Sequence, residues 1–376
     1  MRKTLFLFLL LLMAGNSSAS AQQAKLQPEV MESVELMSII ARTAGYQEYC
    51  NDLAGKYTED TEAWFGSYRN HPTVDYFKNI RNVNYISYDA VISMALHIEA
   101  DNGQVKYLKP KDGFKGAKGI DPYRRWDRVN LDTLLVKLNQ FYADTRFHDF
   151  FQQHQSFYNN VINVFENKVL HLFNQDWYSS FYGVEPTENY RIVIGFTTGG
   201  NYGPTRQLVN GPLERFAIYG YCADPNQGRS FENGKEFVPT LIHVFNHTYV
   251  NPLLHDNAEN AAMVMPIAET LLEHADEGMG RQGYRDPGTL INESLVRAAV
   301  VLYLQDNGFS EKEVQQEMYT QISDGFAWMP ELVKSMRNYT RHRGKYPTLN
   351  EYYPEIAKVL KKYIATEQKR VEKSLK

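Results

Sequence analysis

Two short segments of strand character stand between two long helical stretches, and this order limits the possible fold more than any other feature. Residues 190–197 (YRIVIGFT) and 215–221 (RFAIYGY) are rich in β-branched and aromatic side chains, and turn residues follow both segments. Doubly wound α/β folds alternate strands with helices along the chain, and this sequence shows no such alternation. We therefore expect a predominantly helical α+β protein with a small sheet.

Apolar residues recur at helical spacing before and after these strands. Val34, Met37 and Ile40 predict a helix that Gly45 ends, and Pro72 can open the next one. The polar segment 101–121, rich in Gly and Lys, predicts a loop or a small hairpin.

Aromatic side chains concentrate in the next helical segment, between residues 141 and 158, and this stripe predicts core packing. The composition changes after residue 188, where the strands begin. We therefore divide the chain into a helical N-terminal region over 22–188 and a second region over 189–376.

The first 21 residues have the pattern of a secretory signal peptide. Arg2 and Lys3 precede an apolar run over residues 5–14, and Ala19-Ser20-Ala21 offers a small-residue cleavage site. A helix needs about 20 residues to cross a bilayer, so the run is too short, although an N-terminal anchor is the alternative. We expect cleavage after Ala21 and an exported protein, periplasmic or secreted, without a membrane span.

Charge and cysteine content exclude several classes of function. The chain has 40 basic and 44 acidic residues and no basic block, so we expect no nucleic-acid partner. Cys50 and Cys222 are too few for a disulfide scaffold or a Cys-rich zinc knuckle. An oxidising compartment would permit a bridge between them, and two buried free thiols are the alternative. The oligomeric state is not specified by any pattern in the sequence.

The segment 237–252 (FVPTLIHVFNHTYVNP) carries the strongest chemical pattern. His243 and His247 are four residues apart, so a helix places both imidazoles on one face, where they can hold one metal ion. This is the ligand spacing of the HExxH zinc helix, but Val244 occupies the position of its Glu. Two ordinary surface or core histidines are the alternative.

A third ligand is needed for a zinc ion held by three protein groups, and Glu293 is the best candidate. It lies in the apolar segment 290–304 (LINESLVRAAVVLYL), which predicts a helix with a buried face. A carboxylate among such residues requires a partner, which can be a metal ion or Arg297, four residues on.

Together these segments resemble the gluzincin group of zinc metallopeptidases, in which HExxH on one helix is completed by a Glu on a later helix. The chain also resembles an uncharacterised family of exported Bacteroidetes proteins with a His-Glu-Phe-x-His motif, a following Asn-Pro and a later Glu-x-x-x-Arg-Ala segment. The residues that carry this resemblance are His243, Phe245, His247, Asn251-Pro252, Glu293 and Arg297-Ala298, and residues 34–46 resemble the start of the family. The resemblance implies a zincin-like core over 189–376 and zinc held by His243, His247 and Glu293.

Val244 is the departure from this pattern, because valine has no proton acceptor. A positioned general base contributes about 10²- to 10⁴-fold to a rate, so we expect impaired catalysis. The resulting expectation is a zinc-binding, metallopeptidase-like protein that binds a peptide or protein in its cleft.

Two alternatives remain open at the level of sequence. The protein can be an active zinc-dependent hydrolase with a displaced base, for which Glu236, Glu259 and Glu269 are the nearest carboxylates in sequence. It can also be a non-catalytic, structural exported protein without a metal.

Other residues near these motifs allow both a functional and a purely structural interpretation. The strand 190–197 can be the edge on which an extended peptide docks, or an internal strand without a ligand. Tyr202, His255, Tyr284 and Arg285 can stabilise an oxyanion, or they can be ordinary loop residues.

Overall fold

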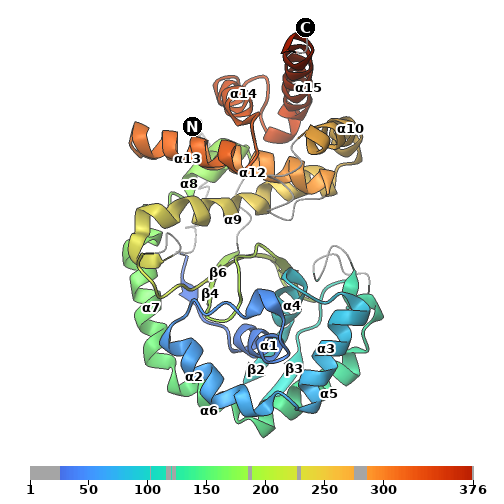
Figure 1. Ribbon diagram of the computed structural model, residues 1–376, viewed down its shortest axis with the longest axis vertical. Coiled ribbons are helices and arrows are strands. Elements are labelled where there is room, and N and C mark those ends of the chain that lie inside the picture. Colours follow the sequence, from blue (N-terminus) through green and yellow to red (C-terminus); the bar gives the residue numbers. More distant parts are fainter. Residues whose placement is uncertain are drawn as a thin grey trace, which may run out of the picture.

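The computed structural model describes residues 26–101, 103–115, 120, 124–184, 189–226, 230–274 and 286–374. Within these residues the protein is α+β and predominantly helical, as the sequence predicts (Figure 1). The expected signal peptide, its cleavage site after Ala21 and the region boundary after residue 188 lie outside the described residues. None of the described helices is both long and apolar enough to cross a membrane.

The first half of the chain is a cluster of helices that carries a short hairpin. The helices are α1 (Glu32–Thr43), α2 (Lys56–Phe65), α3 (Pro72–Asn84), α4 (Asp89–Ala95), α5 (Leu131–Asp144), α6 (Phe147–Gln153), α7 (Gln155–Lys168) and α8 (Asp176–Tyr182). Helix α1 stops just before Gly45, whose φ is +79°, and α3 begins at Pro72, as predicted. The antiparallel strands β2 (Ile98–Asp101) and β3 (Gln104–Tyr107) form the hairpin.

The main sheet has four strands in the order β1-β4-β6-β5. Its strands are β1 (Pro28–Glu29), β4 (Tyr190–Gly195), β5 (Thr205–Gln207) and β6 (Leu213–Gly220). Strands β1, β4 and β6 are parallel, whereas β5 runs antiparallel to β6 at the edge. Both strands expected from the sequence are therefore internal, and the reading of 190–197 as a docking edge is wrong. The edge strand next to β6 is β5.

Alternating charges connect the four strands across one face of the sheet. Arg191 of β4 donates to Glu29 of β1 (Nε to Oε1, 2.7 Å) and to Glu214 of β6 (3.1 Å). Buried Arg206 of β5 donates from Nε to the other oxygen of Glu214, at 2.6 Å. Because each ion pair joins neighbouring strands, the ladder stabilises the register of the two very short strands, β1 and β5.

From Gly234 onward the chain forms a layer of helices above the sheet (Figure 1). These are α9 (Gly234–His255), α10 (Ala258–His274), α12 (Pro287–Asp306), α13 (Glu311–Ser323), α14 (Met329–Arg341) and α15 (Leu349–Ser374). Helix α12 is buried on nearly all sides from Gly288 to Leu304, which places it at the centre of this layer.

Helix α9 lies between the sheet and the other helices of this layer (Figure 1). Two hydrogen bonds hold it over β6. The Tyr219 hydroxyl donates to the carbonyl of Leu241 at 2.9 Å, and Arg215 donates to the carbonyl of Thr248 at 2.8 Å. Helix α9 is thus placed with one side toward the sheet and another toward α12.

The aromatic stripe forms core, as predicted. Phe141, Phe147 and Phe150 are buried, and Phe65 of α2 packs among them, with its ring centroid 4.9 Å from that of Phe150. The two cysteines, which could have formed a bridge, are free thiols.

Glu35 is a carboxyl buried in the first half of the chain, beneath the end of β4. Its Oε1 accepts from the backbone N–H of Phe196 at 2.8 Å, and its Oε2 accepts from the hydroxyls of Tyr57 (2.9 Å) and Thr197 (3.4 Å). Burial raises the pKa of Glu35 from 4.5 to about 7, although these hydrogen bonds lower it. The proton on this group is therefore coupled to folding.

We expect Glu35 to make the protein less stable as the pH rises from 4.5 to about 7. In this window an unfolded Glu35 has lost its proton while the folded one keeps it, so raising the pH favours unfolding. The shift corresponds to roughly 3 kcal/mol in the free energy of unfolding. Denaturant titrations of wild type and Glu35→Gln between pH 4 and pH 8 measure it, and parallel pH profiles for the two proteins would contradict it.

Candidate metal centre

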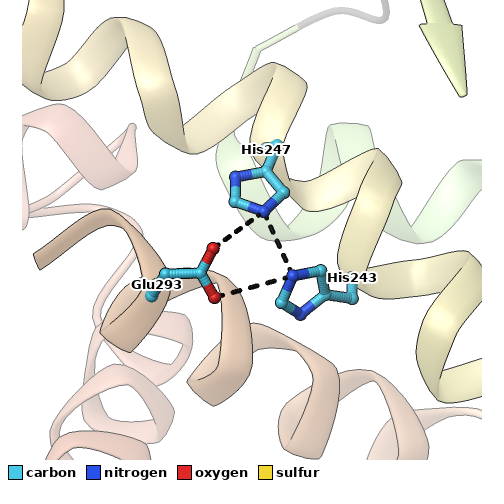
Figure 2. Close-up of side chains that lie close together, drawn as sticks. All are labelled: His243, His247 and Glu293. Atoms are coloured by element: carbon cyan, nitrogen blue, oxygen red, sulfur yellow. Dashed lines mark hydrogen bonds and ion pairs between the residues drawn. The ribbon is translucent and has the colours of Figure 1, made fainter. Parts of the chain in front are cut away.

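His243, His247 and Glu293 come together between helices α9 and α12. The two imidazoles lie one turn apart on α9 and point toward the carboxylate on α12 (Figure 2). The two Nε2 atoms are 3.1 Å apart. The carboxylate oxygens of Glu293 lie 3.6 Å from His243 Nε2 and 3.3 Å from His247 Nε2. The structure thus joins the three residues that the sequence singled out, although 46 positions separate Glu293 from His247 in the chain.

These three groups fit a tetrahedral zinc ion. Zinc binds His nitrogens and carboxylate oxygens at about 2.0–2.2 Å, so neighbouring ligands of a tetrahedron lie about 3.3–3.6 Å apart. The two Nε2 atoms are 3.1 Å apart, and each lies 3.3–3.6 Å from a different oxygen of Glu293. With one ligand atom from each residue, the three atoms lie within 4.8 Å of one another. Two imidazoles and one carboxylate also match the ligand set of zinc sites that keep a fourth position open.

A buried asparagine sets the position of the histidine helix. The side chain of Asn246 also faces α12, where its Nδ2 donates to the carbonyl of Val296 at 3.1 Å. Its Oδ1 accepts from the Tyr182 hydroxyl of α8 at 2.9 Å. These bonds fix α9 against α12, and thereby fix the histidines against Glu293.

Asn251 orients the imidazole of His247. The Oδ1 of Asn251 lies 3.2 Å from Nδ1 of His247, and a carbonyl oxygen can only accept, so the proton sits on Nδ1. Nε2 is then the nitrogen that faces Glu293 and that can bind a metal ion once it has no proton. The Asn-Pro pair was visible in the sequence, but a role for Asn251 four residues after His247 was not assigned.

Arg297 also contacts the carboxylate of Glu293, so the two partners considered from the sequence are both present. Its Nε donates to Glu293 Oε2 at 3.1 Å. Its NH1 donates to Gln321 at 2.6 Å and to Asp324 at 3.1 Å, both in or next to α13. Burial raises the pKa of Glu293, but the two histidines and Arg297 outweigh burial and hold that pKa below its usual range. Glu293 is therefore an ionised, buried carboxylate.

The two histidines differ in their electrostatics. Burial lowers the pKa of His243 to about 3, which keeps this imidazole neutral and its lone pair free. Burial also lowers the pKa of His247, but the hydrogen bond and the charge of Glu293 outweigh it and raise that pKa. A neutral His243 next to an ionised carboxylate has the protonation state that metal binding needs.

The three groups line a cleft of about 1400 Å³. Residues at the ends of β4 and β6 and in the segment 199–205 line it, as do residues of helices α9, α12 and α13. Val244 lies in the lining and is 3% exposed, so no acid or base occupies the position that follows the first histidine. Tyr202 and His255 also line the cleft, whereas Tyr284 and Arg285 lie outside the described residues.

The structure places one of the three carboxylates considered as displaced bases in the cleft. Glu236 lines it, but among the described lining residues neither Glu259 nor Glu269 appears. Glu317 of α13 lines it instead, and burial raises the pKa of this carboxyl, which accepts from Gln321. In sequence Glu317 resembles the other acidic residues of an amphipathic helix, so only the packing of α13 distinguishes it.

The model of one protein family, Domain of unknown function (DUF4932), matches residues 26–359. The chain belongs to this family. The DUF4932 match spans the described residues that line the cleft, including His243, His247 and Glu293. The expected membership of a family of unknown function is therefore confirmed. The comparisons with curated proteins and with solved structures found no match.

We expect the wild-type chain from residue 22 to bind one zinc ion, and His247→Ala to lose it, because two ligands cannot replace three. His255→Ala is the matched control, since His255 also lines the cleft from α9 but lies outside the cluster. Elemental analysis after zinc loading and desalting measures the stoichiometry. Equal zinc in wild type and His247→Ala would contradict this site.

We expect Asn251→Ala to keep the zinc but to weaken its binding by about 10- to 100-fold, because it removes the acceptor that orients His247. Asn251→Asp, which keeps an acceptor oxygen, should lose less. Competition with a fluorescent zinc chelator gives the affinities. Unchanged affinity in Asn251→Ala would show that the imidazole is oriented by other contacts.

Proposed function

We propose that this protein is an exported, zincin-like protein that holds zinc, has lost efficient peptidase activity and binds an extended peptide segment in its cleft. The convergence of His243, His247 and Glu293 in a large cleft, with Val244 beside them, supports this proposal most directly. Export rests on the signal-peptide pattern of the first 21 residues.

The residues at the site support binding better than catalysis. Zinc, when bound, would act as a Lewis acid toward a carbonyl oxygen of a ligand. The chain itself supplies the neutral imidazole of His243, the Nδ1-protonated His247 and the ionised Glu293 to hold the metal. It supplies no proton acceptor at Val244, and peptide hydrolysis needs one to move a proton to the leaving amine.

The sheet edge near the metal centre supports a peptide ligand. The N–H and C=O of Tyr202 both pair with Ile218, at 3.0 and 2.9 Å, and the C=O of Pro204 accepts from Phe216 at 2.9 Å. In an antiparallel ladder alternate residues face the partner strand, so the peptide groups of Gly203 and Thr205 point away from β6. Both residues line the cleft. An extended peptide can pair with such an edge by β-addition.

This open edge passes close to the histidine helix. A Cβ atom placed on Gly203 would lie 3.4 Å from the carbonyl oxygen of Val244 and 3.6 Å from Cβ of His247. The close approach makes a small residue suitable there. A peptide paired with Gly203 would therefore place its backbone next to the metal centre.

The length of the cleft also suits a peptide. Glu236 at the start of α9 and Asp256 just after its end both line the cleft. Helix rise places these two positions about 30 Å apart. An extended chain covers that length with about nine residues. The metal centre lies near the middle of this span.

An active hydrolase with a displaced base is the second candidate, because Glu317 lines the cleft with a raised pKa. We rank it lower because the hydrogen bonds described for Glu317 reach Glu293 indirectly, through Gln321 and Arg297. Nothing in these contacts places its carboxyl beside the two histidines.

The test is binding and cleavage of a fluorescein-labelled positional library of peptides about nine residues long, with the zinc-loaded chain from residue 22. We expect saturable binding without cleavage. Cleavage that a chelator stops and Glu317→Gln abolishes would establish the second candidate instead. Absence of both zinc and peptide binding would leave the purely structural alternative.

We expect Val244→Glu to create peptidase activity on the peptides that the wild type binds, with a gain of about 10²- to 10⁴-fold over any background. The new carboxylate would supply the missing base beside His243. Val244→Gln has nearly the same shape without a base and should stay inactive. Mass spectrometry of the peptides after incubation measures cleavage. An inactive, folded and zinc-loaded Val244→Glu would argue that the cleft does not place a peptide bond over the metal.

A further inference from the structure

Tyr88 has an unusual backbone conformation at the cleft. Its φ is +47° and its ψ is −127°, a region that glycine adopts readily and that bulky residues rarely occupy. Its side chain is 57% exposed and lines the cleft. The ring therefore contributes little to the core, and the backbone would be less strained with glycine.

Two hydrogen bonds hold this conformation in place. The carboxylate of Glu48 accepts from the backbone N–H of Tyr88 at 3.1 Å, and the hydroxyl of Tyr49 donates to its C=O at 2.7 Å. Arg81 fixes Glu48 through two bonds of 2.6 and 2.9 Å, and Tyr49 is fully buried. The neighbouring residues thus hold the strained backbone of Tyr88 at both its N–H and its C=O.

The same contacts place Tyr88 near the open sheet edge. The Tyr49 hydroxyl, which holds the C=O of Tyr88, also interacts with the hydroxyl of Tyr202. Tyr202 immediately precedes Gly203, the first open residue of that edge. Tyr88, Tyr202 and Gly203 all line the cleft, so a peptide paired with the edge would share this cleft with the Tyr88 ring.

We propose that Tyr88 is a specificity-determining residue of the cleft, whose ring receives a bulky apolar or aromatic side chain of the bound peptide. This inference rests on the proposed peptide-binding function. Strained backbone that neighbouring groups enforce is typical of ligand sites, and an exposed, well-placed aromatic ring offers a large contact surface at low entropic cost. Packing of two aromatic rings gives the subsite its preference.

Tyr85 provides a matched control in the same loop. It also has a positive φ, +59°, and its side chain is 74% exposed. It caps the end of α3 and is not among the described residues that line the cleft. A glycine at either position relieves a positive φ, although Tyr85 has the ordinary left-handed conformation (ψ +32°) and Tyr88 does not. Only the change at Tyr88 removes a ring from the cleft.

The experiment compares Tyr88→Gly, Tyr88→Phe and Tyr85→Gly, all zinc-loaded. The probe is the library peptide that wild type binds most tightly. Fluorescence anisotropy gives Kd, and thermal unfolding gives Tm. For Tyr88→Gly we expect an equal or higher Tm but a Kd that rises about 3- to 10-fold, the range of one aromatic contact. Tyr88→Phe and Tyr85→Gly should bind as wild type does.

The library profile tests the class of side chain independently of these variants. We expect wild type to prefer bulky apolar or aromatic residues at one library position, and Tyr88→Gly to lose this preference. A flat profile, a preference for basic residues, or equal weakening by Tyr85→Gly would overturn the assignment of Tyr88. If wild type binds no library peptide, the proposed function itself fails, which is distinguishable from normal binding without a Tyr88 effect.

Discussion

A charged carboxylate in the middle of an apolar helix is the constraint on which the rest of this structure depends. Glu293 is 6% exposed on α12, the helix at the centre of the C-terminal layer. An isolated buried charge is very costly, so cationic or hydrogen-bonding groups must surround it. Arg297 comes from the same helix, but the imidazoles come from α9. This requirement, with the buried bonds of Asn246, explains why α9 packs against α12 in one register.

The site has the residues that metal binding needs, but it has no general base beside the first histidine. The ligand geometry is preserved, and Asn251 orients one of the imidazoles. The position of a general base is filled by Val244, which packs near Gly203 of the open edge. The edge, the metal centre and Tyr88 all line the same cleft. These contacts are the basis of the proposal that the site binds an extended chain without cleaving it.

Much of the fold could be predicted from local patterns. The helix periodicity, the helix end at Gly45, the helix start at Pro72 and the two apolar strands depend on neighbouring residues in the sequence. Strands β1 and β5 were missed, since two or three residues are too few to show a period. Without these short strands, the sequence left open whether 190–197 is an edge or an internal strand, and the structure shows that it is internal. Glu317 was missed for a related reason, because its burial depends on where α13 packs rather than on its neighbours in sequence.

The sequence by itself determined that two imidazoles share one helical face, that Val244 stands where a base would, and that Glu293 lies among apolar residues. These properties follow from side-chain chemistry and from the 3.6-residue period of the helix. Only the tertiary structure decided that the two helices meet, that β5 carries the open edge, and that Tyr88 is held facing the cleft. Such properties depend on contacts between residues far apart in the chain, such as Tyr49 with Tyr88 and Asn246 with Val296, whose formation no local pattern encodes.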